Sequence, residues 1–223
     1  MKFRFLRPTI LTALALGLSA CGGSNSFPVY ATIEGLVYSP LVLIDNVSGK
    51  EFSITPAMLA SSTKIALPLS LNYGDQYDIV VKPAASAPSN ASGMPPHQSC
   101  VVARNKDTAG RLSEINIGVA CSVVAPTVGG AIKLATGKVA TGLTVVNGSR
   151  PAFVANATSV AYGFTGVLYN TSYTPIITVQ PTDTTVHCAF VPAAGVTMGA
   201  NNLSYTGTMG DVEVTVDIDC TLP

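Results

Sequence analysis

The sequence predicts an all-β protein made of two tandem β sandwiches. Only 11% of the 223 residues are charged, and tryptophan is absent. Val, Thr, Ile, Ser, Gly and Pro dominate instead, which is the composition of short strands joined by tight turns. No stretch keeps a helical period, and one order of features occurs twice along the chain. The fold class therefore follows from the composition, the missing helical period and the internal repeat.

Two similar turns mark the internal repeat. Tyr73-Gly-Asp-Gln-Tyr77 and Tyr169-Asn-Thr-Ser-Tyr173 each lead into a β-rich run that ends in proline. Further along, each copy has a cysteine in an apolar run and then closes on a run that ends in a second cysteine. The order of features is the same in both copies while the spacings differ, so we expect two copies of one β unit.

Each copy shows about seven strand-like runs with turn signals between them, which is typical of an immunoglobulin-like sandwich. We expect strands near residues 30–37, 41–46, 50–54, 63–69, 76–83, 98–104 and 113–121 in the first copy, and near 129–134, 142–147, 151–156, 160–167, 173–180, 187–191 and 211–220 in the second. In the last run Val212, Val214, Val216 and Ile218 alternate with polar residues, which predicts a strand with one buried face. Pro56 favours one short helical turn within 55–62.

The first twenty residues have the pattern of a secretory signal. Lys2, Arg4 and Arg7 precede an apolar run at 9–18, and no acidic residue occurs among them. A run of roughly ten residues is half of the ~20 that a membrane-spanning helix needs, so we expect residues 1–20 to be removed. Residues 21–29 are then expected to form a flexible tether. The sandwiches are expected at 30–122 and 128–223.

The segment Leu18-Ser19-Ala20-Cys21 resembles the bacterial lipobox, in which a leucine and two small residues precede a cysteine. The resemblance implies transfer of diacylglycerol to the Cys21 thiol, cleavage between Ala20 and Cys21, and acylation of the new amino group. Two or three acyl chains give stable attachment, since a single chain binds a membrane only marginally. Gly22, where some lipoproteins have Asp, implies the outer membrane by resemblance to Gram-negative sorting rules. The protein would face the periplasm or the surface, and a Gram-positive cell surface stays open.

Four cysteines remain after the one in the lipobox. Cys100, Cys121, Cys188 and Cys220 are an even set in an exported chain, which favours disulfides. Three pairings exist, and the repeat favours Cys100 with Cys121 and Cys188 with Cys220. A metal site would need closer cysteine pairs and more than the two histidines present, so we expect no metal and no cofactor.

Most of residues 30–223 also resembles the tandem domains of uncharacterised proteobacterial surface lipoproteins. In those domains a Gly-Leu hairpin, a Gly-x-x-Tyr turn, a strand ending in proline and two late cysteines recur in this order. The chain departs from the pattern in its second copy, where Asn170 stands in place of the turn glycine and an insertion lengthens the following strand. The resemblance implies no activity that a residue here could inherit.

Charge and motif content exclude several classes of function. Removal of residues 1–20 takes away three of the twelve basic residues, which leaves nine against twelve acidic residues. This weak acidity argues against a nucleic-acid partner, which needs a concentrated basic surface. His97 and His187 are the only histidines, and no nucleophile elbow, His-Glu-x-x-His motif or phosphate-binding glycine loop occurs. We therefore expect that the protein is not an enzyme.

Two features remain as candidate binding surfaces. Tyr73, Tyr77, Tyr169 and Tyr173 offer flat apolar faces with polar tips, which suits a platform for sugars, although their recurrence in both copies favours structural packing. The long loop at 83–96 is of a kind that often carries function.

The sequence thus predicts a lipid-anchored, non-catalytic protein of the cell envelope that acts as a structural or interaction module. The alternative is a carbohydrate- or peptidoglycan-binding module, and a distant third is an enzyme with a site built from undistinctive residues. The expected partners are the membrane, through the amino-terminal lipid, and an envelope protein or glycan.

Overall fold

The computed structural model describes residues 26–83, 92–110 and 112–222, and it confirms an all-β fold of tandem sandwiches. The chain divides into two compact units, one with the described residues of Met1–Glu34, Val42–Gly93 and Val102–Val119, the other with those of Gly35–Leu41, Met94–Val101 and Ala120–Pro223. Strands β1 to β8 form an N-terminal sandwich, and strands β9 to β19 form a C-terminal sandwich.

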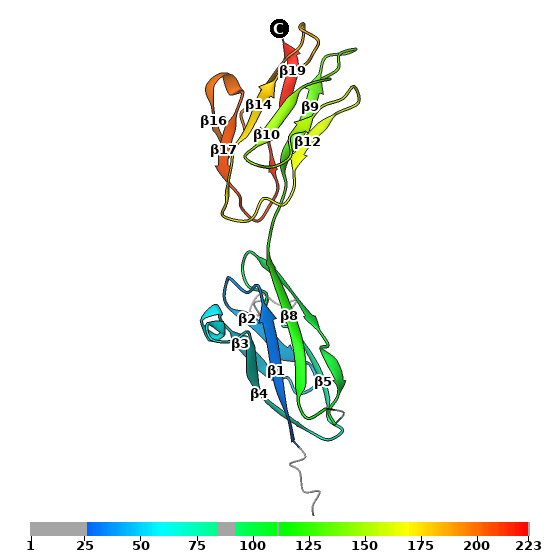
Figure 1. The fold of residues 1–223 in the computed structure, drawn as a ribbon, viewed down its shortest axis with the longest axis vertical. Coiled ribbons are helices and arrows are strands. Elements are labelled where there is room, and N and C mark those ends of the chain that lie inside the picture. The colour runs from blue at the N-terminus through cyan, green and yellow to red at the C-terminus, as the bar shows by residue number, and fades with distance from the viewer. Residues whose placement is uncertain (1–25, 84–91, 111, 223) are drawn as a thin grey trace, which may run out of the picture. The chain divides into compact units, whose positions relative to one another are not determined.

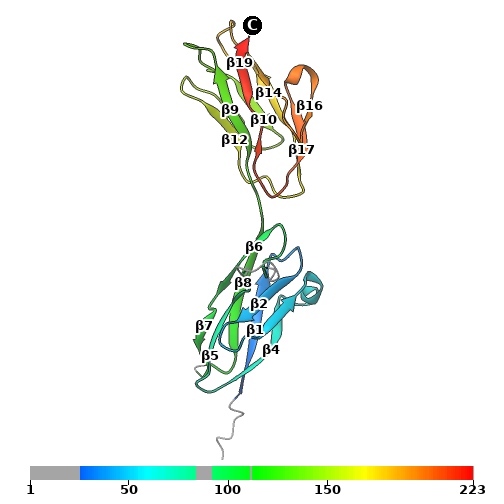
Figure 2. The ribbon, with the colours of Figure 1, turned by 180° about the vertical axis from the view of Figure 1, so that it is seen from behind.

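The N-terminal sandwich consists of two four-stranded sheets, with strand orders β4-β1-β8-β6 and β3-β2-β5-β7. Its elements are β1 (Ser26–Glu34), β2 (Leu41–Asp45), β3 (Glu51–Ile54), the 3₁₀ turn η1 (Pro56–Leu59), β4 (Lys64–Asn72), β5 (Gln76–Val81), β6 (Gln98–Ala103), β7 (Lys106–Thr108) and β8 (Ile115–Val123). Figure 1 shows β1, β4 and β8 in front of β2 and β5, and Figure 2 gives the view from behind. Alternating apolar side chains such as Val29, Leu43, Ile79 and Ile117 are fully buried between the sheets.

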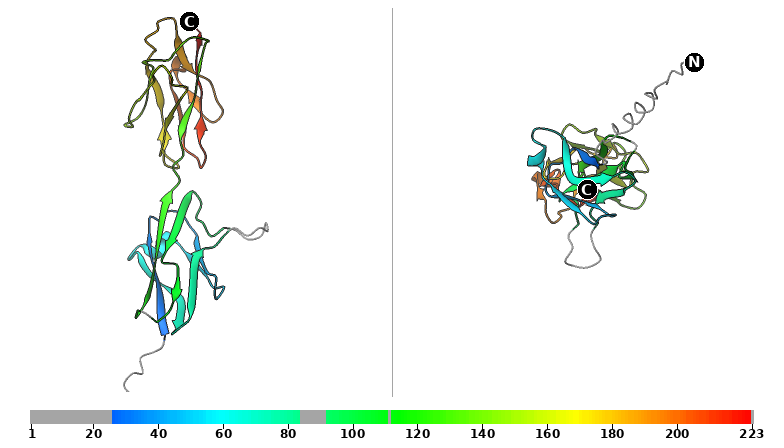
Figure 3. Two further views of the ribbon diagram at one scale, coloured as in Figure 1. Left: turned by 90° about the vertical axis from the view of Figure 1, so that its right-hand side faces the viewer. Right: turned by 90° about the horizontal axis from the view of Figure 1, so that it is seen from below.

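The C-terminal sandwich has more and shorter strands. Its sheets have the orders β12-β9-β19-β15, with β18 also beside β9, then β11-β10-β14 and β13-β17-β16. The elements are β9 (Val128–Leu134), β10 (Thr144–Asn147), β11 (Phe153–Val154), β12 (Ala161–Phe164), β13 (Ser172–Tyr173), β14 (Pro175–Val179), β15 (His187–Phe190), β16 (Thr197–Met198), η2 (Ala200–Asn202), β17 (Tyr205–Thr208), β18 (Val214–Thr215) and β19 (Ile218–Leu222). One apolar cluster, which includes Leu143, Phe190 and Tyr205, contains residues from all of these sheets. Figure 3 gives two further views of the strands.

The first and last strands of the C-terminal sandwich are parallel neighbours. Val128 of β9 pairs with Val214 of β18, and Leu134 pairs with Cys220 of β19. Because parallel strands run in the same direction, the chain enters this sandwich at one end of the strand pair and leaves at the other.

The N-terminal sandwich repeats this arrangement. Strands β1 and β8 are neighbours in one sheet. Gly35, directly after β1, lies so close to the carbonyl oxygen of Cys121, near the end of β8, that a Cβ at this position would collide with it. The two strands therefore end side by side, and Figure 1 shows their arrows pointing the same way.

A buried polar residue ends the second strand of each sandwich. Asp45, fully buried at the end of β2, accepts hydrogen bonds from the backbone N–H groups of Val47, Ser48 and Asp78 and from the Ser48 hydroxyl. Burial alone would raise the pKa of this carboxyl, but the donors, led by the Asp78 N–H, hold its pKa below the ordinary value. Asp45 thus joins the β2–β3 turn to β5.

Asn147 occupies the matching place at the end of β10. Its Oδ1 accepts the N–H of Thr174, which follows Tyr173 as Asp78 follows Tyr77. The Asn147 Nδ2 is buried and has no hydrogen-bond partner within the described part of the chain. The same connection between strands is therefore made by a charged carboxylate in the first copy. In the second copy it is made by an amide that forms fewer hydrogen bonds.

The predicted strand at 211–220 is wrong as a single element. It is divided into β18 and β19, and Val212 is 74% exposed instead of buried. The interruption has a visible cause, because the carboxylate of Asp217 accepts the N–H of Ala131 in β9 at 3.0 Å in place of a backbone acceptor. Val216 and Ile218 keep the expected buried orientation.

Two other differences concern strand limits. β1 begins at Ser26, so residues 26–29, expected in the tether, belong to the strand, where Phe27 pairs with Leu71 and Val29 is buried. Strands β7, β16 and β17 were not predicted. β7 consists of three exposed residues and β16 of two residues, so neither shows an apolar alternation along the sequence.

We expect Asp45→Ala to lower the free energy of unfolding of the N-terminal sandwich by about 3 kcal/mol, because it leaves buried N–H donors without an acceptor. Asp45→Asn, which copies the residue of the second repeat, should cost less, since one acceptor oxygen remains. The lowered pKa means that the charged form stabilises the fold above about pH 4 and that this stabilisation is lost as the pH falls further. Urea unfolding of the three proteins from pH 7 to pH 3 measures both effects. Equal stability of the alanine and asparagine variants would contradict this role.

Candidate functional site

The lipobox and Cys21 lie outside the described residues, as do residues 84–91 of the loop at 83–96. The predicted lipid attachment therefore stays a prediction. In the stretches that the structure describes, no helix has the length and apolar character needed to cross a membrane.

The four remaining cysteines form two disulfides, Cys100–Cys121 and Cys188–Cys220, as the repeat predicted. The first joins β6 to β8 and the second joins β15 to β19, and each pair of strands is adjacent in its sheet. In both sandwiches the second cysteine is the third residue from the end of the last strand. Each bridge therefore fixes the strand by which the chain leaves its sandwich.

The four tyrosines do not form one platform. Tyr77 and Tyr173, the second tyrosine of each turn, are buried in their own sandwiches, so neither ring can present a face to a ligand. Tyr73 is 75% exposed, and its ring lies against Gly110, where an added Cβ would collide with it. Tyr169 is half-buried. A ligand surface that uses all four rings is thus inconsistent with their burial, and Tyr73 is the ring most open to solvent.

A hollow of about 340 Å³ lies beside His187, the exposed first residue of β15. Its lining combines apolar residues such as Phe190 and Pro192 with the polar side chains of His187, Asn202 and Asp219. An apolar floor with a few polar groups is the general composition of small-ligand sites. Among the side chains that the structure describes, no Ser, Thr, Cys or Lys lines the hollow, so none of them offers His187 a nucleophile to activate there.

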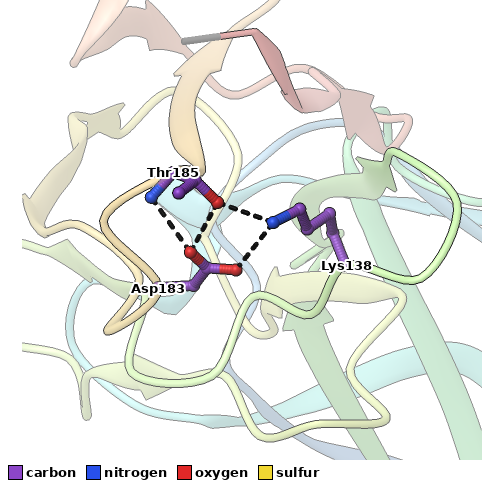
Figure 4. A network of polar contacts seen from close by, with 3 residues as sticks. All are labelled: Lys138, Asp183 and Thr185. Atoms are coloured by element: carbon purple, nitrogen blue, oxygen red, sulfur yellow. Dashed lines mark hydrogen bonds and ion pairs between the residues drawn. The ribbon is translucent and has the colours of Figure 1, made fainter.

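A second polar group joins two loops of the C-terminal sandwich (Figure 4). Lys138 Nζ lies 3.1 Å from Asp183 Oδ2 and donates to Thr185 Oγ1 at 2.6 Å, and the Thr185 hydroxyl and N–H both donate to Asp183 Oδ1. The Thr185 donors, with Lys138, lower the pKa of Asp183 to about 2. A carboxylate with so low a pKa is a poor general base, so the group acts as a tie between loops.

Metal binding has no support among the residues that the structure describes. No group of three or more His, Cys, Asp or Glu side chains is placed to hold an ion. Asp217, one of the acidic residues near the carboxyl end, forms an ion pair of 2.8 Å with Lys133.

Besides Asp45 and Asn147, three further buried side chains with polar groups were missed in the sequence: Gln98, Tyr162 and Tyr205. Gln98 accepts the N–H groups of Val37 and Tyr38 and donates to the carbonyl of Gly35, which fastens the loop after β1. Glutamine is a common residue type, and Gln98 stands in a run without any motif, so no local signal could have identified its role.

The other two are the tyrosines of a buried pair. The Tyr162 hydroxyl donates to the carbonyl of Val216 at 2.6 Å, so Tyr205 donates to Tyr162 at 2.9 Å. Burial raises the pKa of both phenols, which keeps both protonated and the chain of hydrogen bonds intact.

Sequence comparison identifies no relative of the chain. No family model matches it, and no curated protein matches it in sequence.

Comparison with solved structures gives distant similarities. The TIE protein of Bacillus anthracis is 11% identical over 88% of this chain, with a TM-score of 0.40, and the chain spans only 34% of that protein. A Mobiluncus mulieris adhesin with disulfide, isopeptide and ester cross-links is 12% identical over 82% of this chain and 83% of its own, with a TM-score of 0.33. The major pilin of Streptococcus pyogenes is 9% identical over 90% of this chain and 99% of its own, with a TM-score of 0.30. Similarity of this degree does not establish a shared function.

We expect replacement of both Cys188 and Cys220 by alanine to lower the free energy of unfolding of the C-terminal sandwich by about 4 kcal/mol. The matching change at Cys100 and Cys121 should cost the N-terminal sandwich about 3 kcal/mol, because its bridge closes a shorter loop. The separations are 32 and 21 residues. Urea unfolding of both variants, followed by a probe in each sandwich, measures the two losses. An unchanged midpoint in either sandwich would show that its bridge does not stabilise the fold.

Proposed function

We propose that the chain is a non-catalytic structural module of the bacterial cell surface, attached to the outer membrane by lipid at Cys21. In this role the two sandwiches serve as a spacer that carries an interaction surface away from the membrane. The observation that carries the proposal is the pairing of first and last strands in each sandwich. A domain whose chain enters at one end and leaves at the other adds its full length to a tether.

The chemistry of the described residues supports a structural role. The described side chains that line the His187 hollow include no nucleophile, and the Asp183 carboxylate is bonded to Lys138 and Thr185. Catalysis needs a nucleophile or base aimed at a common reacting point, and neither of these two polar groups, as described, combines them.

The disulfides support export. Two native bridges form and persist in oxidising compartments, which include the periplasm and the cell surface. The signal-like segment at 1–20 and the lipobox cysteine agree with that compartment.

We expect protein extracted from membranes to lack residues 1–20, to carry acyl chains on Cys21 and to contain two disulfides. Intact mass under non-reducing conditions measures all three features, and Cys21→Ser is the matched control, which should be unacylated and released from the membrane. An unacylated wild-type protein would contradict lipid anchoring and leave a freely secreted module.

The His187 hollow favours one alternative function, the binding of a carbohydrate such as a peptidoglycan fragment. An imidazole, an amide and a carboxylate around an apolar floor match the hydroxyl groups and apolar face of a sugar ring. Tyr73 offers an exposed ring surface in the N-terminal sandwich.

The spacer role predicts no saturable binding when the chain is titrated with soluble peptidoglycan fragments in a calorimeter. Binding that disappears in Asn202→Gly would instead establish the glycan function at the hollow. Glycine suits this position because Asn202 has a φ of 53°, so the variant removes the amide without straining the backbone. Binding that disappears only in Tyr73→Ala would place the glycan on that ring.

A further inference from the structure

We propose that each sandwich resists tension along the chain: its first and last strands must slide past each other along their length before the ends can separate, and its disulfide holds the last strand in the sheet. The inference deepens the proposed function and rests on it only for the source of the load. A surface module fixed to a membrane at one end is pulled along its chain when a partner moves.

The C-terminal sandwich shows the arrangement in its register. The chain enters at Val128, which pairs with Val214, and it leaves after Cys220, which pairs with Leu134 at the far end of β9. Tension between the two ends pulls β9 toward its start and β19 toward its end. The strands must then slide past each other, so every hydrogen bond between them is loaded at once.

A peeling geometry would be much weaker. If both pulling points were at the same end of the strand pair, the bonds would break one after another, and each is individually modest. Forced unfolding is governed by the unfolding rate, so a path that breaks many bonds in one step needs a larger force. The same set of hydrogen bonds therefore withstands a larger force when it is sheared than when it is peeled.

The interface between β9 and the last strands is held by specific bonds. Val214 donates to the carbonyl of Thr127 at 3.0 Å, and Val216 donates to the carbonyl of Gly129 at 2.8 Å. The Val216 carbonyl also accepts from the Tyr162 hydroxyl, so Val216 is held through both of its backbone groups.

The disulfide stands where the load enters. Cys220, the third residue from the end of β19, is bonded to Cys188 in β15. Tension that arrives at the end of β19 passes through the bridge into β15, so β19 cannot be peeled from its other neighbour. Sliding against β9 is then the remaining route by which the ends can separate.

The N-terminal sandwich has the same parts. β1 and β8 are neighbours and end side by side at Gly35 and Cys121. Cys121, the third residue from the end of β8, is bonded to Cys100 in β6. Two sandwiches with different strand numbers thus share the parallel pair and the bridge at the exit strand.

The test pulls single molecules of the full chain carrying Cys21→Ser. In one geometry the handles are at the two termini. In the other, the second handle is attached through an azide-bearing amino acid in place of Val212, which is 74% exposed and lies two residues before Val214. The second geometry peels β9 from β18, while the N-terminal sandwich is loaded through its termini in both cases and serves as the internal control.

We expect the C-terminal sandwich to open at about half the force, or below, when it is pulled through position 212. The opening force of the N-terminal sandwich should not change. Chain length identifies each event. Under terminal pulling, reduction of the disulfides should lengthen the C-terminal extension by about 110 Å and the N-terminal extension by about 70 Å, from loop separations of 32 and 21 residues.

A pair of proline variants separates the strand interface from general stability. Val214→Pro removes the N–H that bonds to Thr127, whereas Thr197→Pro alters the edge strand β16, outside the path of the load. We expect Val214→Pro to lower the opening force under terminal pulling and Thr197→Pro to leave it unchanged, with urea unfolding run on both variants as the measure of overall stability.

Equal opening forces in the two geometries would overturn the proposal, as would equal losses of force in the two proline variants. Neither result depends on Cys21. A failure of lipid anchoring is detected by intact mass and leaves the mechanical result standing, so the two proposals fail separately.

Discussion

Each sandwich depends on the parallel contact between its first strand and its last. In the C-terminal sandwich two consecutive glycines in β9 permit close approach on both sides, and Gly130 is the one that faces the last strands. A Cβ at Gly129 would collide with the carbonyl of Tyr162 in β12, and a Cβ at Gly130 would collide with the carbonyl of Val216. The strands on either side of β9 therefore approach it more closely than a side chain would allow. An alanine at either position would force β9 away from one of its neighbours.

The two copies keep this contact and change much of the rest. Asp45 and Asn147 both accept the N–H of the residue after the second tyrosine, but the carboxylate accepts four hydrogen bonds and the amide oxygen one. The N-terminal copy uses long strands in two sheets, whereas the C-terminal copy uses short strands and a cluster of buried aromatic rings such as Phe190 and Tyr205. Strand pairing and the disulfide are thus the constant features, and the filling of the core is the variable one.

Local patterns predicted the features that depend on neighbouring residues. The strand-like runs of the first copy located β2, β3, β4 and β5, and the internal repeat predicted both bridges. The repeated Tyr-x-x-x-Tyr turn also marked true structural equivalents, because its second tyrosine is buried in both sandwiches. The pattern could not show that Tyr73 faces solvent, since orientation there depends on Gly110, far away in sequence.

Features that depend on distant partners could not be predicted. The division of 211–220 follows from the bond between Asp217 and Ala131, and the role of Gln98 follows from a loop 60 residues or more before it. The His187 hollow combines residues of β15, η2 and β19, which no motif connects. In physical terms, the periodicity of each strand is visible in the sequence. Sheet order and side-chain hydrogen bonds depend on residues that meet only when the chain folds.

Native-state hydrogen exchange measures the central contact most directly. If the first and last strands hold the sandwich together, the amide protons of Val214 and Val216, which bond into β9, should exchange only by global unfolding, as slowly as that of Ile177 in the core strand β14. The amide of Thr197 in the edge strand β16 should exchange faster through local opening. Exchange of Val214 and Val216 at the rate of the edge strand would contradict the account, because the last strands could then leave β9 while the sandwich stayed folded.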